Sequence, residues 1–481
     1  MTLDYTGRLR EIEKEIFARR PEHSINPSLE RMKALVTLLG DPQQTFPVIH
    51  LTGTNGKTST SRMTEALLRA RGLRTGLFTS PHLSFIGERI CVDGQPLDAE
   101  QFVTVYDEIK PYVDMVDATH EVPLSFFEVM VGMAFAVFAD APVDVCVLEV
   151  GMGGTWDNTN VADGAVAVVT PISLDHTKYL GSTVEEIAAD KAGIIKAGAV
   201  AVLAQQPPAA AEVLLRRAAE VGASVAREGL EFGVVSRELA VGGQQVSVRG
   251  LLGDYPDLYL PLFGAHQAGN LACAIAAVEA FARTPGAAAG DDDAPLDRDI
   301  VRRAVATMTS PGRLEVIRRS PVVLIDSAHN PGGMAATVAA LTEAFSFTEL
   351  IAVVSVFADK DVVGVLGELE PVVSHLVATA NSSPRAVPAQ RLGEIAAAVF
   401  GPDRVSVAER LDDAIELGVA LADEADAAAS GGPGQAGVLV TGAVVTAGEA
   451  RVLLGEGAGT DRESGAGAWG VHGGRPPVGR S

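Results

Sequence analysis

The sequence predicts an α/β protein of two domains, and three observations support this prediction. Strand-like apolar runs alternate with helix-like segments along most of the chain, as in mostly parallel, helix-flanked sheets. Short alternating runs at 231–262 indicate a small antiparallel piece, and the α/β pattern restarts at Val322. A chain of 481 residues is also too long for one compact domain. We expect an N-terminal domain at 1–310, a smaller Rossmann-like domain at 311–455 and a disordered, glycine-rich tail at 456–481.

The elements of the N-terminal domain follow from the period of the apolar residues and from glycine and proline at their ends. The chain opens with two helices, at 4–20 and 29–39, followed by a buried strand at Phe46–Leu51 and a helix at Ser59–Arg71. Further strands are expected at 74–79, 88–92, 143–150, 165–171 and 199–204, and further helices at about 99–117, 126–139, 185–196, 264–283 and 296–308. Pro285–Pro295 reads as a flexible surface insertion.

The C-terminal domain shows the same alternation on a smaller scale. Its first strand, Val322–Asp326, ends in a polar and glycine-containing turn before a helix. The later strands are expected at 350–356, 375–380 and 437–441, and the helices at about 361–369, 388–399, 409–424 and 445–454. The Gly/Ala/Ser-rich stretch at 425–436 is interpreted as a loop.

Composition limits the classes of partner. A formal net charge of −23 argues against nucleic acid or an acidic membrane surface as the main partner. Cys91, Cys146 and Cys273 are too few and too scattered for a disulfide framework or a metal site, which fits a reducing cytoplasm. No signal peptide is visible, and the apolar runs fall short of the ~18–20 residues that span a membrane. We expect a cytoplasmic protein with small-molecule partners.

The most informative stretch is the turn between the strand at Phe46–Leu51 and the next helix. Glycines let the backbone approach a polyphosphate, and N–H groups at a helix start point toward its oxygens. The strict pattern G-x-x-x-x-G-K-[ST] fails, because Leu51 replaces its first glycine. We nevertheless interpret the turn as an ATPase-like phosphate loop, the alternative being an ordinary connection with a solvated Lys57. The residues assigned to the nucleotide are Gly53, Thr54, Asn55, Gly56, Lys57, Thr58 and Ser59.

Acidic and polar residues follow other strands of the same sheet. Glu149 closes an apolar strand, which is the position of the carboxylate that holds magnesium beside a phosphate loop. The alternative is that Glu149 simply faces water at the end of its strand. Ser80 and His176 follow the strands at 74–79 and 165–171. Ligands bind at the carboxyl ends of parallel strands, so Ser80 lies where a ligand is expected. A lone histidine such as His176 would usually be structural, but with Glu149 one strand away it becomes a candidate metal ligand.

Together these motifs resemble the ATP-dependent Mur-type ligases and, within them, the folylpolyglutamate synthase/dihydrofolate synthase family. The resemblance extends over roughly residues 5–455. The segments that support it are 26–31, 50–58, 79–83, 87–90, 125–128, 148–154, 175–177, 190–194, 311–313 and 326–331.

This resemblance implies a monomeric enzyme that uses ATP and two Mg²⁺ ions, with ATP bound between its domains, to attach L-glutamate to dihydropteroate or to a folate through an acyl phosphate. The implied catalytic residues are Lys57, Glu149, His176, Lys191 and His329. The implied metal ligands are Thr58, Ser80, Glu149, His176 and a carbamylated Lys191. Beyond the loop, the implied nucleotide contacts are Asn270, Arg313 and Asp326. The implied pterin-side residues are Asn26, Pro27, Ser28, Leu29, Arg89, Ser125, Phe126, Phe127, Glu128 and Trp156.

The residues alone leave simpler alternatives open. Lys191 could be a helix-surface lysine paired with a neighbouring acid, Asn270 a cap or surface amide, and Arg313 an interdomain salt-bridge partner. Asp326 with His329 could be a helix-entry turn. The chain also departs from the family, which commonly has Arg-Leu-Asp-Ala where residues 155–158 are Thr-Trp-Asp-Asn, and Thr-Gly-Ser where residues 441–443 are Thr-Gly-Ala.

Two other functions fit the sequence less well. A Mur-type cell-wall amino-acid ligase predicts a further domain before the phosphate loop, where this sequence has only about 50 residues, too few for a usual domain. A nucleotide-binding scaffold without catalysis predicts loss of the chemical residues, yet Lys57, Glu149, His176 and Lys191 are all present.

Overall fold

The structure is a computed structural model that describes residues 4–21, 26–284, 294–428 and 436–455. Two expectations lie wholly or mostly outside this part of the chain. They are the disordered tail at 456–481 and the surface insertion at Pro285–Pro295, of which only the last two residues are described.

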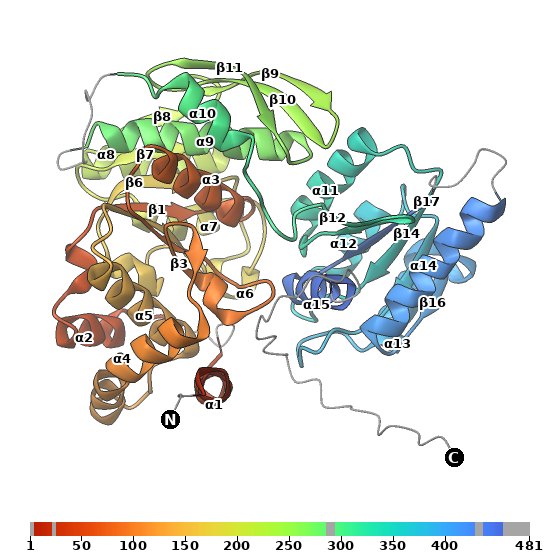
Figure 1. The fold of residues 1–481 in the computed structure, drawn as a ribbon, viewed down its shortest axis with the longest axis horizontal. Coiled ribbons are helices and arrows are strands. Elements are labelled where there is room, and N and C mark those ends of the chain that lie inside the picture. The colour runs from red at the N-terminus through yellow and green to blue at the C-terminus, as the bar shows by residue number, and fades with distance from the viewer. Residues whose placement is uncertain (1–3, 22–25, 285–293, 429–435, 456–481) are drawn as a thin grey trace. The chain divides into compact units, whose positions relative to one another are not determined.

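The chain forms two compact units (Figure 1). The first consists mainly of residues up to Leu314, and the second mainly of residues from Glu315 onward. Both are α/β, which confirms the predicted fold class, whereas the domain limits at 1–310 and 311–455 stay a prediction.

An eight-stranded sheet organises the first unit, in the order β4-β3-β2-β5-β1-β6-β7-β8. All neighbours run parallel except at β3 and β4, which pair antiparallel. The strands are β1 Val48–Thr52, β2 Thr75–Phe78, β3 Ile90–Val92, β4 Gln95–Pro96, β5 Val145–Glu149, β6 Gly164–Val169, β7 Val200–Leu203 and β8 Ser224–Arg227. β1 lies between β5 and β6, so the turn that follows it opens at the middle of the sheet.

Helices cover both faces of this sheet, as its sequence of buried strands requires. They are α1 Tyr5–Phe17, α2 Glu30–Leu38, α3 Lys57–Ala70, α4 Ala99–Thr119, α5 Phe126–Asp140, α6 Thr177–Leu180, α7 Val184–Lys191, α8 Pro208–Val221, α9 Ala265–Ala282 and α10 Arg298–Val305. Ile49 and Leu51 of β1 point into a core shared with α3, α9 and α10. Val48 points into the opposite core, with α1, α2, α4 and α5.

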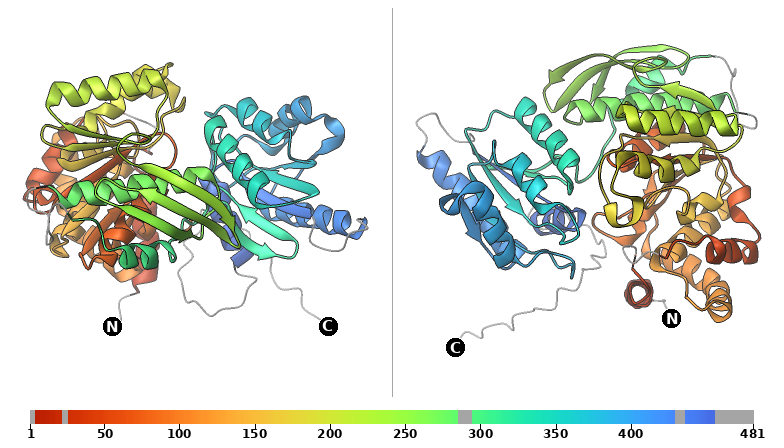
Figure 2. Two further views of the ribbon diagram at one scale, coloured as in Figure 1. Left: turned by 90° about the horizontal axis from the view of Figure 1, so that it is seen from above. Right: turned by 180° about the vertical axis from the view of Figure 1, so that it is seen from behind.

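The predicted antiparallel piece is a three-stranded sheet in the order β11-β10-β9 (Figure 2). Its strands are β9 Gly233–Ala240, β10 Gly243–Arg249 and β11 Asp254–Leu260. Val246, Leu258 and Leu260 bury the inner face of the sheet in the core that also contains α9. This sheet therefore packs on α9, the helix that carries Asn270.

A six-stranded sheet organises the second unit, in the order β12-β13-β17-β14-β15-β16. β12 pairs antiparallel with β13, and the other neighbours run parallel. The strands are β12 Glu315–Arg319, β13 Val322–Ile325, β14 Glu349–Val354, β15 His375–Ala378, β16 Val405–Val407 and β17 Ala436–Thr441. The helices along this part of the chain are α11 Pro331–Ala344, α12 Val362–Leu369, α13 Ala389–Phe400, α14 Leu411–Ala428 and α15 Val444–Gly455.

Sequence reasoning missed four strands, β4, β8, β12 and β16, all at sheet edges. β8 buries only Ala226, while β4, β12 and β16 bury no residue completely, so none carries the apolar alternation that reveals a strand. Helices α6 and α8 were also missed. The predicted loop at 425–436 is wrong at both ends, because α14 continues to Ala428 and β17 begins at Ala436. Its other residues, 429–435, lie outside the part of the chain that the structure describes.

In the part of the chain that the structure describes, no helix combines the length and apolar character needed to cross a membrane.

Candidate active site

The turn after β1 depends on two glycines. Gly53 has φ +147°, and a Cβ placed on it would lie 1.9 Å from the Thr170 hydroxyl oxygen at the end of β6. Gly56 has φ +89°, and its Cβ would lie 2.5 Å from Oδ1 of Asn270 on α9. A side chain at either position would be strained and would clash. The turn can pass this close to its neighbours because both residues are glycine.

The segment after β6 holds the loop in place. The backbone N–H groups of Thr54 and Asn55 donate to the carbonyl of Pro171, at 3.0 and 3.3 Å. The Thr54 hydroxyl donates to the Ser173 carbonyl and accepts from the Ser173 N–H, both at 3.0 Å. Helix α3 then begins at Lys57, and the first N–H groups of an α-helix have no acceptor within the helix. The turn is thus fixed in place ahead of a helix N-terminus, which is a favourable setting for an anion.

Two lysines converge on the loop. Lys57 Nζ donates to the carbonyls of Gly53 and Thr54, at 3.2 and 3.3 Å, and Lys191 Nζ donates to the same Gly53 carbonyl at 2.8 Å. Lys191 is only 3% exposed. Burial, and then the charge of Lys57, lower the pKa of Lys191 to about 7, against the opposing charges of Asp190, Asp175 and Asp157. The alternative of a helix-surface lysine is therefore wrong for Lys191.

Glu149 lies beside the loop, at the end of the neighbouring strand β5. Its carboxylate accepts a hydrogen bond from the Thr58 hydroxyl at 2.8 Å and one from the Ser80 N–H at 3.4 Å. Burial raises the pKa of Glu149, although the charges of Lys57 and Arg313 and the two hydrogen bonds oppose this rise. Glu149 therefore contacts two other predicted metal ligands, the hydroxyl of Thr58 and the backbone of Ser80, and it does not face water.

His176 is placed differently. It has φ +51°, at the start of α6, and its side chain is 30% exposed. Its Nε2 lies 3.9 Å from Oδ2 of Asp175. No three His, Cys, Asp or Glu side chains among the described residues gather so that they could hold a metal ion. The Thr58 hydroxyl and the Glu149 carboxylate nevertheless fit Mg²⁺, because this ion prefers oxygen ligands and keeps several waters or substrate phosphates.

The other predicted nucleotide residues of the first unit surround the loop. Asn270 is buried in the first turns of α9, and its Nδ2 donates to Gln267 at 3.1 Å. Arg313 is near enough for its charge to lower the pKa of Glu149. Ser59, in contrast, shares a buried hydrogen bond of 2.9 Å with Ser310, so its hydroxyl is engaged away from the loop.

In the second unit, Asp326 and His329 follow β13. Asp326 is buried and accepts the Ala328 N–H at 2.8 Å, and His329 Nδ1 lies 3.0 Å from the Ser327 carbonyl oxygen. These contacts belong to the turn that leads into α11. They are what a helix-entry turn requires, and they leave the nucleotide role of Asp326 as a prediction.

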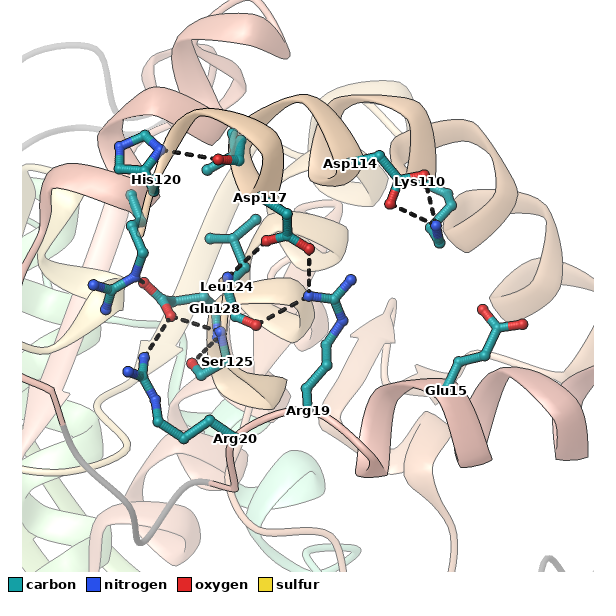
Figure 3. A network of polar contacts seen from close by, with 12 residues as sticks. Glu15, Arg19, Arg20, Lys110, Asp114, Asp117, His120, Leu124, Ser125 and Glu128 are labelled. Carbon is teal, nitrogen blue, oxygen red and sulfur yellow. Dashed lines mark hydrogen bonds and ion pairs between the residues drawn. The ribbon is translucent and has the colours of Figure 1, made fainter. Parts of the chain in front are cut away.

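Most of the predicted pterin-side residues around α5 are buried. Ser125 and Glu128 form the capping box of this helix, and Phe126 and Phe127 belong to the core beneath it. The Arg89 guanidinium lies 4.8 Å from the ring centroid of Phe126, and its Nε donates to His82 at 2.8 Å. Figure 3 shows the polar contacts around Ser125 and Glu128.

The remaining pterin-side residues are more accessible. Asn26 and Pro27 are exposed, while Ser28, Leu29 and Trp156 are half-buried. Sequence reasoning missed Arg31, which pairs with Glu128. The sequence did contain a signal for a role of Arg31. This residue lies inside the segment 26–31 that carries part of the family resemblance, and it is a charged residue in the first turn of a largely apolar helix.

Comparison with known proteins agrees with this architecture. The sequence matches the Mur ligase middle domain over residues 51–278 and the Mur ligase glutamate ligase domain over residues 312–443. Together with the phosphate loop, these two matches define a ligase of the Mur type.

Individual relatives identify the family within this class. The dihydrofolate synthase/folylpolyglutamate synthase of Mycobacterium tuberculosis is 49% identical over 94% of this chain and 95% of its own length. The protein of the same name from Bacillus subtilis is 33% identical, covering 76% and 84%. A solved structure of Mycobacterium tuberculosis folylpolyglutamate synthase complexed with ADP has a TM-score of 0.89 and 49% identity, covering 94% of this chain and 99% of that one. This chain belongs to the folylpolyglutamate synthase/dihydrofolate synthase family of ATP-dependent ligases, which confirms the resemblance.

The buried amine of Lys191 predicts a specific pH dependence of stability. Its pKa is about 7 in the folded chain, against 10.5 for an ordinary lysine in water, so between these values only the unfolded chain binds the proton. The free energy of unfolding must therefore rise with pH across this window. Lys191→Met removes this dependence, and at about 1.4 kcal/mol per pKa unit it should stabilise the protein by up to about 5 kcal/mol at pH 7.

Chemical denaturation of both proteins in CO₂-free buffer, at several pH values between 6.5 and 10, measures this difference. The stabilising effect of Lys191→Met should shrink steadily as the pH rises. A difference that stays constant over this range would show that burial does not lower the pKa of Lys191.

Proposed function

We propose that this protein uses ATP to attach L-glutamate to dihydropteroate, to folate polyglutamates or to both, through an acyl-phosphate intermediate. The observation that supports this most strongly is the contact between the Thr58 hydroxyl and the Glu149 carboxylate, directly beside Lys57. Such a group of residues binds a triphosphate and its counter-ion. Family membership favours the folate ligase over the cell-wall ligase as the reaction that uses this site. The ADP in the solved relative supports the use of ATP, which both reactions share.

The chemistry explains why cations must collect at this loop. A carboxylate is a poor electrophile, so one of its oxygens takes the γ-phosphoryl group of ATP, and ADP leaves. The neutral glutamate amine then attacks the acyl carbon and loses a proton, so that the C–N bond forms as the C–O bond to phosphate breaks and phosphate leaves. Bringing a folate carboxylate to ATP puts anions together, and this repulsion must be offset. Lys57 and the N-terminal N–H groups of α3 supply positive charge at the required place.

In this proposal Lys57 exchanges its acceptors when the nucleotide binds. Its ammonium leaves the Gly53 and Thr54 carbonyls and contacts the terminal phosphates. Thr58, Ser80 and Glu149 are the residues that would hold Mg²⁺, which neutralises phosphate charge when it is bound. His176 and Lys191 would contribute to a second ion. Asn270 and Arg313 would contact the nucleotide.

Lys191 can serve as a metal ligand only after modification. As an ammonium it would repel a cation. A pKa of about 7 leaves a large fraction of the amine neutral at physiological pH, and the neutral amine is the form that adds CO₂ to give a carbamate. A carbamate provides an anionic oxygen, the type of donor that Mg²⁺ prefers.

The remaining assignments are part of the same proposal. Asp326 keeps the nucleotide role and His329 a role near the phosphates or the incoming glutamate. The segment Asn26–Leu29, with Arg89 and Trp156, keeps the pterin role. The state proposed for the enzyme is a monomer in the cytoplasm, where three unpaired, buried cysteines would remain reduced.

The function is tested with purified protein, ATP, Mg²⁺ and L-glutamate, offered dihydropteroate and tetrahydrofolate in separate reactions. Mass spectrometry should show a product one glutamyl residue heavier with at least one of the two. Lys57→Ala should lower the rate of amide formation by roughly 10²–10³-fold or more, since it removes charge stabilisation from the transferred phosphoryl group. Circular dichroism should show that this variant keeps the fold.

Lys110→Ala is the matched control, because Lys110 is paired with Asp114 on the surface of α4 and should leave the rate unchanged. Full activity of Lys57→Ala would contradict the proposed site. Absence of product with both substrates would contradict the proposed reaction.

Carbamylation of Lys191 makes a separate prediction. Lys191→Ala should lose roughly 100-fold or more in activity, because losing even a residue that only supports a metal ligand costs about 10–100-fold. Bicarbonate should not restore this activity, whereas acetate or propionate should restore part of it by placing a carboxylate in the vacated space. Lys191→Arg fills that space and should gain nothing from either acid. If no carboxylate restores activity to the alanine variant, the carbamate is unsupported.

A further inference from the structure

Glu128 is a fully buried carboxylate at the start of α5, and several donors share it. Oε2 accepts the Ser125 N–H at 2.7 Å and Arg20 Nη2 at 3.4 Å, and Oε1 accepts Arg31 Nε at 2.9 Å. Figure 3 shows Arg20, Ser125 and Glu128 pointing toward one another. Because the donors already occupy both oxygens, this carboxylate is poorly placed to receive a substrate as well.

The two arginines come from either side of the segment Asn26–Leu29, to which the proposed function assigns the pterin substrate. Arg20 follows α1, and Arg31 lies in the first turn of α2. Arg31 has a second contact, because its Nη2 donates to the Asn26 carbonyl at 3.3 Å. One guanidinium therefore connects the buried carboxylate to the backbone of this segment.

The charges explain why the carboxylate is needed. Arg31 is 7% exposed and Arg20 20% exposed, and burial together with the charge of Arg31 lowers the pKa of Arg20. Two partly desolvated guanidinium groups would repel each other without an anion between them. Glu128 holds both, and so fixes the orientation of Arg31.

We infer that Glu128 and Arg31 form a positioning pair for folate binding: Glu128 orients Arg31, and Arg31 fixes the backbone of Asn26 and hence the segment Asn26–Leu29. This inference rests on the proposed function. It replaces a direct substrate contact of Glu128 with an indirect role. The hydroxyl of Ser125, which caps α5 by accepting the Glu128 N–H at 3.2 Å, is likewise engaged within the protein.

Three variants test the pair: Arg31→Lys, Glu128→Gln and the double variant. Lysine keeps the charge but cannot contact Glu128 and Asn26 with a rigid fork, and glutamine keeps the shape but loses the charge. Each single variant should raise the KM for tetrahydrofolate about 10-fold, or the KM for dihydropteroate if the wild type accepts only that substrate. The kcat and the KM values for ATP and glutamate should change less than about 2-fold, because only binding of the pterin substrate is affected. The double variant should be no worse than the poorer single one, since both act through one contact.

Asp117→Asn is the matched control. Asp117 accepts Arg19 at 2.9 Å and the Leu124 N–H at 2.7 Å, so it makes an arginine pair close by without any contact to Asn26. Its KM for tetrahydrofolate should stay at the wild-type value. Melting temperatures of all variants identify any that fail to fold, and Arg31→Lys, which keeps a cation beside Glu128, provides the test if Glu128→Gln does not fold.

The outcomes separate the possibilities. Effects of the two single variants that multiply in the double variant would show that Glu128 and Arg31 act independently, and would overturn the positioning pair. An unchanged KM for tetrahydrofolate, or an equal loss in kcat and in every KM, would overturn the positioning role. If the wild-type protein forms no glutamylated product, it is the proposed function that fails.

Discussion

The hydrogen bond between the Thr58 hydroxyl and the Glu149 carboxylate is the contact on which the candidate site depends. It exists because β1 and β5 are neighbouring parallel strands whose carboxyl ends meet, with Leu51 in register with Glu149. The chain leaves β1 through a turn that only glycine permits at residues 53 and 56, and α3 then starts beside the end of β5. Sheet topology, rather than any single side chain, thus brings the helix start to the acid.

This arrangement gathers charges that would be more stable in water. Glu149 and Lys191 are both buried. Burial raises the pKa of Glu149 and lowers that of Lys191, and both shifts favour the neutral form of the group. Two lysines also share the Gly53 carbonyl. Such clusters of perturbed groups are typical of functional sites, where the fold keeps charges in place for a ligand that will complete them. Triphosphate and metal ions are the ligands that would offset this particular imbalance.

Much of this site could be predicted from the sequence, because its chemistry lies in short local patterns. The loop at 53–58 and the acid at the end of an apolar strand are each read within a few residues, and parallel topology places them at one edge. The burial of Lys191 could not be read in this way. Its helix also carries Glu186 and Asp190, so the neighbouring charges favour a lysine on the surface. Only the folded structure, in which Lys191 donates to the Gly53 carbonyl, shows that the side chain is buried.

The same limit applied to α5. The segment at 125–128 was expected to contact substrate, but Glu128 closes a local capping box with Ser125. It also pairs with Arg20 after α1 and Arg31 in α2, which lie more than 90 residues earlier in the chain. Edge strands were missed for a related reason, because a strand that buries one side chain or none leaves no apolar alternation to detect. Contacts distant in sequence and shallow burial account for most of what pattern reasoning missed.

The most direct test of the central claim is a crystal structure of this protein with Mg²⁺ and a non-hydrolysable ATP analogue. We expect the Lys57 ammonium to leave the carbonyls of Gly53 and Thr54 and to lie within hydrogen-bond distance of the terminal phosphate, with Thr58 and Glu149 on the metal. A nucleotide bound elsewhere, with Lys57 still on the two loop carbonyls, would contradict this account.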